Sequence, residues 1–565
     1  MNQKIIPIAV QPVSRERKRQ APKGRRVDPV ALAEVQLLLG TESRQADLLI
    51  EHLHKIQDHF GHLSAAHLAA LAQEMRLAQT EVYEVATFYH HFDVVKEGEA
   101  APAALTVRVC DSLSCEMAGA RELLAKLPKL LGKEVRVISA PCVGRCEQAP
   151  VVVVGQNPVA NASAEAVAIK VAAQQVRHVP SGFIDYASYQ AGGGYVLLKD
   201  CMNSKRDLES VIQTLEDSGL RGLGGAGFPS GRKWRIVRAE AAPRLMAVNI
   251  DEGEPGTFKD RVYLERDPHR FLEGMLIAAW AVGISQIYIY LRDEYHGCRA
   301  MLEAELAELK RSPPVAGLPE IILRRGAGAY VCGEESAMIE SIEGKRGLPR
   351  LRPPYVAQVG LFGRPTLEHN FETLFWVREI LEKGAAWFSS HGKNGRKGLR
   401  SFSVSGRVKR PGVKLAPAGI TIQELIDEHC GGMLEGHTFY AYLPGGASGG
   451  ILPAAMNHIP LDFDTLQSYG CFIGSAAVMV LSDQDSAVGA ARNLTRFFQH
   501  ESCGQCTPCR SGTAKAASLI KQPKWDKALL AELSSVMRDA SICGLGQAAP
   551  NPIDCVIKYF PHELA

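Results

Sequence analysis

Four cysteines near the end of the chain have the spacing of an iron–sulfur ligand set. Cys503, Cys506 and Cys509 are separated by two residues each, and Cys543 comes after a gap of 33 residues. Three thiolates spaced in this way can occupy three corners of a cubane, and a distant fourth closes it. The segment between them, residues 512–538, must then fold back to deliver the last thiolate. The spacing predicts a [4Fe-4S] cluster on these four residues.

A second group of four cysteines lies in the first third of the chain. Four residues separate Cys110 from Cys115, three separate Cys142 from Cys146, and 26 lie between the pairs. Two thiolates on each of two loops suit a two-iron cluster, in which each iron takes one pair. Zinc is the alternative, although zinc pairs prefer a two-residue spacing. Disulfide exchange needs C-x-x-C, which neither pair has. We predict a [2Fe-2S] cluster here.

The remaining cysteines are not at ligand spacing, and we interpret them as buried small apolar groups. The chain holds fourteen cysteines and begins without a recognisable export signal. This combination is typical of cluster ligation in a reducing compartment rather than of disulfides, so we expect a cytoplasmic protein. The six cysteines outside the two ligand groups are Cys201, Cys298, Cys332, Cys430, Cys471 and Cys555.

A glycine-rich stretch between the two cysteine groups could hold a phosphorylated cofactor. Residues 218–234 read SGLRGLGGAGFPSGRKW, with five glycines between Gly219 and Gly227 and then a cationic pair at Arg232 and Lys233. A backbone without Cβ atoms can approach a flat or anionic ligand, and its free N–H groups bind phosphate. An acidic segment, residues 251–254, follows. We predict a cofactor site here, with a chance glycine-rich loop as the alternative.

The glycines also match the G-x-G-x-x-G pattern of dinucleotide-binding Rossmann units. Gly222, Gly224 and Gly227 have that spacing, but the pattern requires a strand before it and a helix after it. Here an amphipathic helix is predicted before the glycines, and Phe228-Pro229 follows them. An ordinary Rossmann dinucleotide site is therefore disfavoured.

Four motifs, in this order, resemble the NADH-binding flavoprotein subunit of respiratory complex I and its relatives: GGAGFPSGRKW, NIDEGEPGTFKDR, AYVCGEESAMIESIEG and ESCGQCTPCR. The resemblance runs from about residue 185 to the C-terminus. The block before it resembles the small thioredoxin-like iron–sulfur subunit of the same module. Such a fusion is similar to the diaphorase subunits of soluble NAD-dependent formate dehydrogenases and of NAD-reducing hydrogenases.

The resemblance implies that the chain binds FMN and NAD(H) and that hydride moves between nicotinamide and flavin. Glu254 and Glu335 would lie beside the reacting groups. They would contribute to catalysis through orientation and electrostatics rather than as an acid or a base. His369 stands where the family usually has an asparagine, and Leu223 where an arginine is common. The implied cofactor-binding residues are Gly222, Gly224, Gly225, Gly227, Phe228, Lys233, Asn249, Asp251, Glu252, Glu254, Tyr330, Gly333, Glu334, Glu335, Tyr355, Asn370 and Thr373.

The leading functional interpretation is the NAD-side β subunit of a soluble formate dehydrogenase. It depends on the fusion order and on resemblance in VYEVATFYHHFDVV and LGQAAPNPIDCVIKYFPHEL. No pterin or molybdenum motif is visible, so formate is expected to react on a metal-containing α subunit with molybdenum or tungsten. The alternatives are the diaphorase subunit of a NAD-reducing hydrogenase and a fused complex I subunit. A scaffold subunit without flavin would lack the pocket residues.

Several domains must position these motifs, because 565 residues exceed one hydrophobic core. Apolar content of 46% and charged content of 22% are typical of soluble globular proteins, and a net charge of +3 argues against nucleic-acid binding. The apolar stretch 271–291 divides into helix-like and strand-like halves, so a membrane span is not predicted. We expect an α/β multidomain fold with a basic arm (1–27), a helical subdomain (28–100), a thioredoxin-like domain (101–175), a linker (176–195), a Rossmann-like FMN/NAD domain (196–395), a β-grasp domain (396–455) and a C-terminal helical domain (456–565).

Two features of the N-terminal part leave alternatives open. Residues 1–27 hold eight basic residues against one acid, which indicates either a disordered tail or an arm that becomes ordered on an acidic face of a partner. The histidines between His52 and His91 are scattered without paired ligand geometry, so surface or capping roles are favoured over a metal site.

Overall fold

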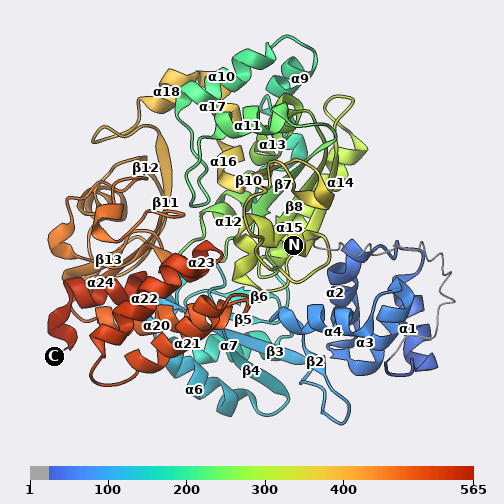
Figure 1. Ribbon diagram of the computed structural model, residues 1–565, viewed down its shortest axis with the longest axis horizontal. Helices are drawn as coiled ribbons and strands as arrows, with labels where there is room; N and C mark the ends of the chain where they lie inside the picture. Colours follow the sequence, from blue (N-terminus) through green and yellow to red (C-terminus); the bar gives the residue numbers. More distant parts are fainter. Residues whose placement is uncertain (1–23, 565) are drawn as a thin grey trace, which may run out of the picture.

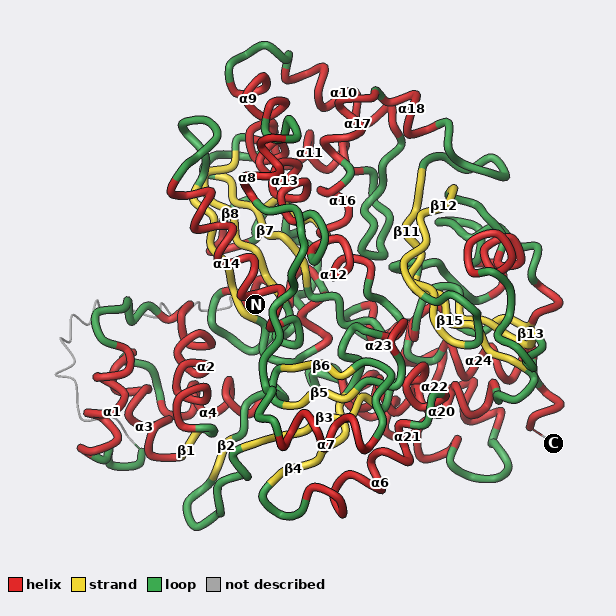
Figure 2. Tube along the Cα trace, turned by 180° about the vertical axis from the view of Figure 1, so that it is seen from behind, coloured by secondary structure: helices red, strands yellow, loops and turns green. Residues whose placement is uncertain are grey.

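The computed structural model describes residues 24–564, in which helices surround four β-sheets (Figures 1 and 2). The predicted α/β multidomain fold is confirmed. The predicted basic arm, residues 1–27, lies outside the described residues except for its last four. Within residues 24–564, no helix is both long and apolar enough to cross a bilayer.

The N-terminal unit consists of four helices and a short pair of parallel strands. Val35, Leu53 and Val82, each on a different helix, are fully buried where the apolar faces meet. Ser64 accepts a hydrogen bond from the backbone N–H of His67 and so caps the third helix. The elements are α1 (Pro29–Leu39), α2 (Leu49–Phe60), α3 (Ala65–Met75), α4 (Gln79–Phe88), β1 (Leu63–Ser64) and β2 (Val94–Val95).

The next unit is a four-stranded sheet in the order β4-β3-β5-β6. Val107 and Val109 of β3 are fully buried in the core that the sheet forms with helices α6 and α7. Cys110 ends β3, and Cys142 follows β4 by two residues; because these strands are parallel, both cysteines lie at one edge of the sheet. The elements are β3 (Leu105–Cys110), α5 (Leu113–Met117), α6 (Ala120–Leu131), β4 (Val135–Ala140), β5 (Val152–Val154), β6 (Asn157–Val159) and α7 (Ala164–Ala172).

The central sheet has four parallel strands in the order β10-β7-β8-β9. Its strands are mostly apolar because helices pack against them, as parallel sheets require. The apolar stretch 271–291 forms most of α13 and β8, and both are buried in this core. The carboxyl ends of all four strands lie at one edge, where ligands bind in such sheets. The elements are α10 (Leu208–Ser218), α11 (Ser230–Ala239), β7 (Arg244–Ile250), α12 (Lys259–Leu264), α13 (Pro268–Val282), β8 (Ile284–Leu291), α14 (His296–Arg311), β9 (Glu320–Arg325), α15 (Glu335–Ile342), β10 (Thr366–Asn370), α16 (Phe371–Phe375), α17 (Val377–Lys383) and α18 (Ala385–Ser389).

The segment predicted to be a linker, residues 176–195, is a packed part of the central unit rather than a free connection. It contains α8 (Tyr186–Ala191), and α9 (Val196–Met202) follows directly. The Tyr189 hydroxyl donates a hydrogen bond of 2.6 Å to the fully buried carboxylate of Glu273 in α13. A buried carboxylate needs such a partner, so this tyrosine holds the segment against the core.

A five-stranded sheet in the order β12-β11-β15-β13-β14 follows. Its first elements have the predicted ββαβ order. β15 (Ala477–Ser482), however, lies between β11 and β13, although we had placed residues 456–565 in a helical domain. All six of its residues are buried, which explains why it fills the middle of the sheet. The other elements are β11 (Leu399–Gly406), β12 (Gly412–Pro417), α19 (Ile422–Glu424), β13 (Phe439–Leu443) and β14 (Leu452–Pro453).

The chain ends in a group of helices beside this sheet and above the first four-stranded sheet (Figure 1). Two of them, α21 and α22, run out and back as a hairpin, as the cysteine spacing requires. This hairpin returns Cys543 to the part of the chain that holds Cys503, Cys506 and Cys509. The helices are α20 (Ala487–Glu501), α21 (Thr507–Ile520), α22 (Lys527–Ala540), α23 (Gly544–Ala548) and α24 (Asn551–Tyr559).

Candidate flavin, dinucleotide and cluster sites

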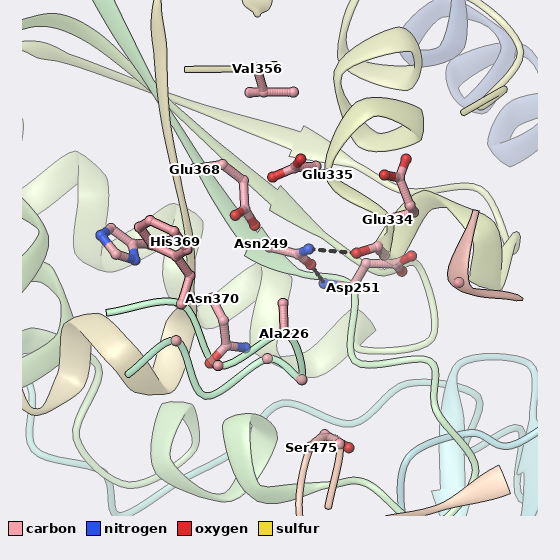
Figure 3. Close-up of a pocket in the computed structure, with 18 of the residues that line it drawn as sticks. Ala226, Asn249, Asp251, Glu334, Glu335, Val356, Glu368, His369, Asn370 and Ser475 are labelled. Atoms are coloured by element: carbon pink, nitrogen blue, oxygen red, sulfur yellow. Dashed lines mark hydrogen bonds between the residues drawn. The ribbon is translucent and has the colours of Figure 1, made fainter. Parts of the chain in front are cut away.

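A cavity of about 790 Å³ lies at the carboxyl ends of β7 and β10 (Figure 3). This volume is within the range of small-molecule and cofactor sites. The loop that joins α10 to α11, the start of α15 and three segments from the C-terminal half of the chain line it. Every predicted cofactor-binding residue except Thr373 is among the lining residues.

The glycine loop between α10 and α11 forms a cradle with no room for side chains at two positions. Gly227 has a φ of +66°, and a Cβ atom there would lie 2.7 Å from the ring of Phe463. A Cβ atom on Gly224 would lie 3.0 Å from the Cβ atom of Asn370. The Gly222 N–H donates to the carbonyl of Phe228 at 2.8 Å and closes the loop. The exposed backbone of this loop fits a phosphorylated, planar group such as FMN.

Two polar residues at the end of β7 provide a second test of this fit. The Asn249 side chain donates to the carbonyl of Gly333 at 2.9 Å and accepts from the Asp251 N–H at 3.0 Å (Figure 3). Burial raises the pKa of Asp251 well above its usual range. Its Oδ2 atom is buried and has no hydrogen-bond partner among the described residues. A ligand hydroxyl group would satisfy it, as expected for a sugar-alcohol chain.

The acidic segment after β7 contains two glutamates with different surroundings. Glu252 already has hydrogen-bond partners within the protein. Its carboxylate accepts hydrogen bonds from the backbone N–H groups of Asp260 and Arg261 at 2.8 and 3.1 Å. Burial, and then the nearby Asp260 carboxylate, raise its pKa to about 7. Glu254 accepts from the Tyr330 hydroxyl and, at 2.7 Å, from the backbone N–H of Ser448. Burial also raises the pKa of Glu254.

The start of α15 carries the other predicted acids. Glu334 is the N-cap and accepts from two backbone N–H groups of the helix at 3.0 Å. Its carboxylate therefore has a structural role beside any contact with a ligand. Glu335 forms an ion pair of 2.8 Å with Arg352 and lies near Glu368 (Figure 3). Burial, together with repulsion from Glu368, raises the pKa of Glu335.

Lys233 reaches the same region of the cavity from α11. Its ammonium group donates to the backbone carbonyl of Glu368 at 2.9 Å and forms an ion pair with that carboxylate at 3.2 Å. Two aromatic rings are exposed where they line this cavity, Phe228 at 39% and Tyr355 at 55%. Exposed rings next to mixed charges can stack on a planar nucleotide base.

Two predicted residues on β10 and α16 act through the protein rather than only through a ligand. Asn370 donates to Asp260 at 2.7 Å and caps α16. Thr373 is fully buried and does not line the cavity, but its hydroxyl accepts from the Leu223 N–H at 2.9 Å. It holds the glycine loop from behind. His369 accepts a hydrogen bond of 2.8 Å from the Trp234 indole N–H, which gives this ring a fixed orientation in the core.

Several residues that line the cavity from later in the chain were not predicted. Ser448 donates the backbone hydrogen bond to Glu254, and the Ser475 hydroxyl lies 2.6 Å from that of Thr257. Gly544 and Leu545 also line the cavity, immediately after Cys543. These residues come from loops and a short helix without a recognisable motif, so only the tertiary structure brings them to the site.

The first cysteine group forms a compact buried set. Cys110, Cys115, Cys142 and Cys146 are between 1 and 4% exposed. The Cys142 and Cys146 sulfurs are 3.3 Å apart, and the Cys110 thiol lies within hydrogen-bonding reach of Cys115 and Cys142. Phe258, between the acidic segment and α12, packs against Cys142 and Cys146. Four thiols from two loops fit the predicted two-iron cluster.

The second cysteine group lies at the start of α21 and α23. Cys506 is the N-cap of α21, and Cys543 is the N-cap of α23. Burial, and also Glu334 and Cys503, raise the pKa of Cys543 to about 12. The thiol of Cys543 is therefore close to Cys503 and also to Glu334 at the start of α15. This arrangement fits a four-iron cluster beside the cavity.

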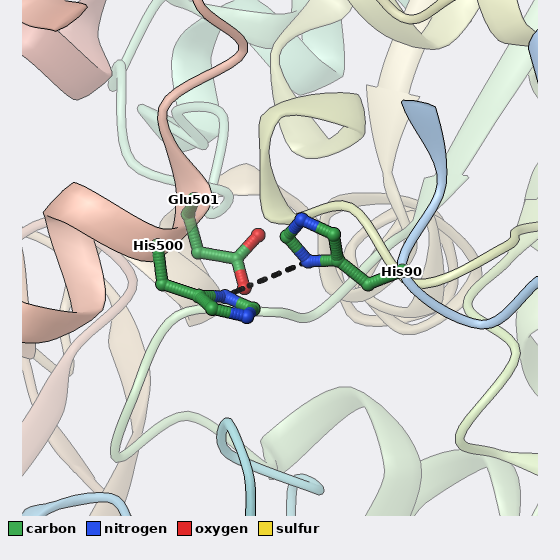
Figure 4. A group of neighbouring side chains, drawn as sticks. All are labelled: His90, His500 and Glu501. Atoms are coloured by element: carbon green, nitrogen blue, oxygen red, sulfur yellow. Dashed lines mark hydrogen bonds and ion pairs between the residues drawn. The ribbon is translucent and has the colours of Figure 1, made fainter. Parts of the chain in front are cut away.

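Two histidines from separate parts of the chain meet near this cluster site (Figure 4). His90 follows α4, His500 lies in the last turn of α20, and their ring centroids are 4.2 Å apart beside Glu501. Three such donors can bind a metal ion. Both Glu501 oxygens, however, already accept hydrogen bonds, one from His500 at 3.0 Å and one from the Tyr330 N–H at 3.0 Å. We interpret this group as a polar bridge between the N-terminal helices and the cavity wall.

Two of the cysteines that we expected to be isolated are paired in space. The Cys471 and Cys555 sulfurs are 3.6 Å apart, although the two residues are 84 positions apart in the sequence. Spacing along the chain could not reveal this pair. All fourteen cysteines lie within the described residues and are free thiols.

Comparison with family models accounts for most of the chain. Residues 215–379 match the Nuo51 FMN-binding domain, and residues 35–174 match the thioredoxin-like [2Fe-2S] ferredoxin. Residues 401–452 match the SLBB domain. Residues 489–565 match the NADH-ubiquinone oxidoreductase-F iron-sulfur binding region. The predicted cofactors FMN, NAD, [2Fe-2S] and [4Fe-4S] are confirmed at the level of these domains.

Individual relatives support the same conclusion. An NADH-quinone oxidoreductase subunit of Rhizobium meliloti (strain 1021) is 39% identical over 399 residues, which cover 68% of this chain and 94% of the relative. The mitochondrial NADH dehydrogenase [ubiquinone] flavoprotein 1 of Dictyostelium discoideum is 38% identical, over 66% of this chain and 81% of the relative. A solved chain of a NAD+-reducing [NiFe]-hydrogenase in the H2-reduced state has a TM-score of 0.82 at 33% identity, over 92% of this chain and 93% of that chain. The chain therefore belongs to the family of complex I 51-kDa-like FMN-binding flavoproteins, here fused to a thioredoxin-like [2Fe-2S] domain.

Proposed function

We propose that the chain is the NAD-side (diaphorase) subunit of a soluble NAD-dependent formate dehydrogenase. It exchanges hydride between NAD(H) and FMN, and it exchanges single electrons with a metal-containing α subunit through its two clusters. One observation supports this proposal most strongly. A single cavity is lined by the glycine loop, by Glu335 and by Gly544, which directly follows Cys543.

When bound, FMN supplies the ability to take up a hydride and to release its electrons one at a time. The protein's part is to hold and orient the reactants. The glycine loop binds the phosphate group of FMN, because no side chains cover its backbone N–H groups. Asn249 and Asp251 line the cavity at the end of β7. The unpartnered Asp251 oxygen accepts a hydrogen bond from a hydroxyl group of the ligand.

NAD(H) binds at the exposed side of the cavity. Phe228 and Tyr355 stack on its planar rings, and Glu335 accepts hydrogen bonds from its hydroxyl groups. Arg352, which is paired with Glu335, offsets part of the negative charge at this position. Lys233, which is paired with Glu368, offsets part of the negative charge of that carboxylate. The nucleotide therefore meets a balanced rather than a strongly acidic surface.

Glu254 is a positioning residue for the reaction centre in this proposal. The Tyr330 hydroxyl and the Ser448 N–H both donate to its carboxylate and hold it in place. Because hydride transfer itself moves no separate proton, Glu254 and Glu335 contribute orientation and charge rather than acid or base catalysis.

The two cysteine groups adjoin the cavity and would hold the clusters, which would supply one-electron transfer to and from the flavin. The [4Fe-4S] set, Cys503, Cys506, Cys509 and Cys543, adjoins the wall that contains Gly544 and Glu334. The [2Fe-2S] set, Cys110, Cys115, Cys142 and Cys146, packs through Phe258 against the segment that carries Glu254. The proposed compartment is the cytoplasm, on the basis of the many free thiols.

The formate assignment rests on the fusion order and on resemblance in the segments 82–95 and 545–564. The diaphorase subunit of a NAD-reducing hydrogenase is the second candidate. It is favoured by the likeness to the solved hydrogenase chain, which extends over 92% of this chain.

Two experiments separate these proposals. For the diaphorase activity, the purified chain with its clusters is titrated with NADH without oxygen, and we expect the flavin absorbance to bleach and an artificial dye to be reduced. A protein that holds no flavin, or that does not bleach, would contradict the proposal. For the partner, the native complex is isolated and its metals are measured. Molybdenum or tungsten with formate-dependent NAD+ reduction supports the formate dehydrogenase, whereas nickel with hydrogen-dependent reduction supports the hydrogenase.

A further inference from the structure

Cys471 and Cys555 form a buried pair of thiols outside the two cluster sites. Their sulfurs are 3.6 Å apart, and the residues are 1% and 2% exposed. Cys471 lies in the loop before β15, and Cys555 lies in α24. The structure makes room for the pair, because a Cβ atom on Gly450 would lie 2.6 Å from one sulfur and 2.9 Å from the other.

The pair borders a second cavity of about 350 Å³. The side chains of Arg538 and Lys558 also line this cavity. Arg538 is paired with Asp554. A thiolate is the reactive form of cysteine, and nearby cations stabilise it. The hydrogen bond from the Cys471 thiol and the positive charge of Lys558 lower the pKa of Cys555. Lys558 lies three residues after Cys555 in α24, on the same face of the helix, so we take Cys555 as the attacking thiol.

Two contacts connect the thiol pair to the cofactor cavity. Phe472 directly follows Cys471 and lines both cavities. On the α24 side, Asn551 donates a hydrogen bond of 2.9 Å to the Ser448 carbonyl, and Ser448 in turn holds Glu254. A change in the distance between the two sulfurs acts on both connections.

We propose that Cys471 and Cys555 form a dithiol site that peroxides oxidise to a disulfide. The Cys555 thiolate attacks one oxygen of hydrogen peroxide, and the other oxygen leaves as hydroxide, which takes up a proton to become water. The Cys471 thiol then attacks the resulting sulfenic sulfur, loses its proton, and releases a second water. In total, two thiols lose two electrons and two protons, and one peroxide becomes two waters.

Disulfide formation shortens the sulfur–sulfur distance from 3.6 Å to about 2.05 Å. This draws the loop at 471–472 toward α24 and changes the position of Phe472 in the cofactor cavity. We expect the oxidised protein to oxidise NADH more slowly. The effect on NADH oxidation rests on the proposed function, whereas disulfide formation does not.

The test uses the purified complex with all its cofactors, treated with one equivalent of hydrogen peroxide without oxygen. Free thiols are then alkylated, and the digested protein is analysed by mass spectrometry. We expect a cross-linked peptide pair that contains Cys471 and Cys555 and that dithiothreitol separates. If both cysteines are recovered alkylated after treatment, or oxidised without a cross-link, the proposal is wrong.

The functional consequence is measured in the same samples as NADH-dependent dye reduction. We expect at least a twofold loss of rate after peroxide and its recovery with dithiothreitol. The variants Cys471→Ser and Cys555→Ser should lose this reversible response, and Cys430→Ser, which replaces another fully buried cysteine, should keep it. A rate loss that persists in the first two variants belongs to cluster damage and would overturn the proposed effect on activity. Absence of NADH oxidation before treatment would instead contradict the proposed function and leave the cross-link result valid.

Discussion

The two sides of the cofactor cavity differ in how the chain builds them. The glycine-loop side consists of the loop between α10 and α11, the ends of β7 and β10, and the start of α15. The second side is the rest of the lining from later in the chain and consists of Ser448, Phe472, Ser475, Gly544 and Leu545. The first side belongs to one sheet and carries recognisable motifs. The second side is assembled from the β-grasp sheet region and the C-terminal helices.

This difference indicates a division of labour. The glycine-loop side offers backbone donors, paired charges and exposed rings, which are suited to binding. The second side offers no charged groups, and its residue Gly544 directly follows Cys543. Binding and electron transfer can therefore be altered separately, and this separation can be tested.

Removal of the cluster ligand Cys543, next to the second side of the cavity, should have the largest effect on electron transfer. In Cys543→Ala one iron loses its thiolate, so we expect loss of the [4Fe-4S] signal in electron paramagnetic resonance and about 100-fold slower electron transfer to the partner subunit. Flavin content and flavin reduction by NADH should remain. Cys430→Ala is the matched control. Unchanged electron transfer in Cys543→Ala would contradict the separation of the two sides.

A change in the glycine loop should have the next largest effect, on the other side. Gly227→Ala places a Cβ atom 2.7 Å from the Phe463 ring at a φ of +66°, and the backbone strain alone costs about 1–2 kcal/mol. We expect the affinity for FMN, measured by fluorescence, to fall about tenfold or more. Gly192→Ala is the control, because its φ is −80° and its nearest neighbours are 3.5 Å away or more. Full flavin retention in Gly227→Ala would show that the cradle does not bind FMN.

A third variant separates the two ligands within the glycine-loop side. In Glu335→Gln the charged acceptor is lost, and we expect the Kd for NADH to rise about tenfold while FMN content stays constant. Glu334→Gln is the comparison, because Glu334 caps α15. That variant should lower the melting temperature more than it changes the NADH affinity. Equal loss of FMN and NADH in Glu335→Gln would remove its assignment to the nucleotide.

The smallest expected effect concerns pH and the acidic segment between the two sides. The pKa of Glu252 is raised from 4.5 to about 7 in the folded protein, mainly by burial. The folded chain therefore holds this proton more tightly than the unfolded chain. The resulting stability is complete below about pH 4.5 and is lost as the pH rises through 7. We expect the melting temperature to fall by a few degrees between pH 5 and pH 8, and to fall less in Glu252→Gln. An equal slope in both proteins would contradict this role.

Local features of the fold and site could be predicted because nearby residues carry the signal. The helix before the glycines, the helix and strand in 271–291 and the cap at Ser64 follow from periodicity and capping. The position of β15 could not be predicted, since its apolar run fits any buried strand and its neighbours in the sheet lie earlier in the chain. The packing of α8 depends on a buried carboxylate in α13, which is invisible without the fold.

The site shows the same limit residue by residue. Thr373, which was predicted to contact the cofactor, does not line the cavity, and its hydroxyl accepts a hydrogen bond from the Leu223 N–H. Glu252 likewise uses its carboxylate to hold the start of α12. A residue type and a motif position do not reveal which hydrogen bonds the chain itself already makes.

The sequence by itself determined which chemistry this protein can perform. Cysteine spacing, a run of glycines and acids at a strand end are local patterns, because two or three ligands of each cluster, and the backbone of the loop, lie within a few residues of one another. The tertiary structure alone decided where these parts meet. A parallel sheet brings the ends of β7 and β10 together, the α21–α22 hairpin returns Cys543 to the cavity wall, and packing across 84 residues places Cys471 against Cys555. Such contacts depend on how apolar faces bury one another, and no short segment of the chain records that information.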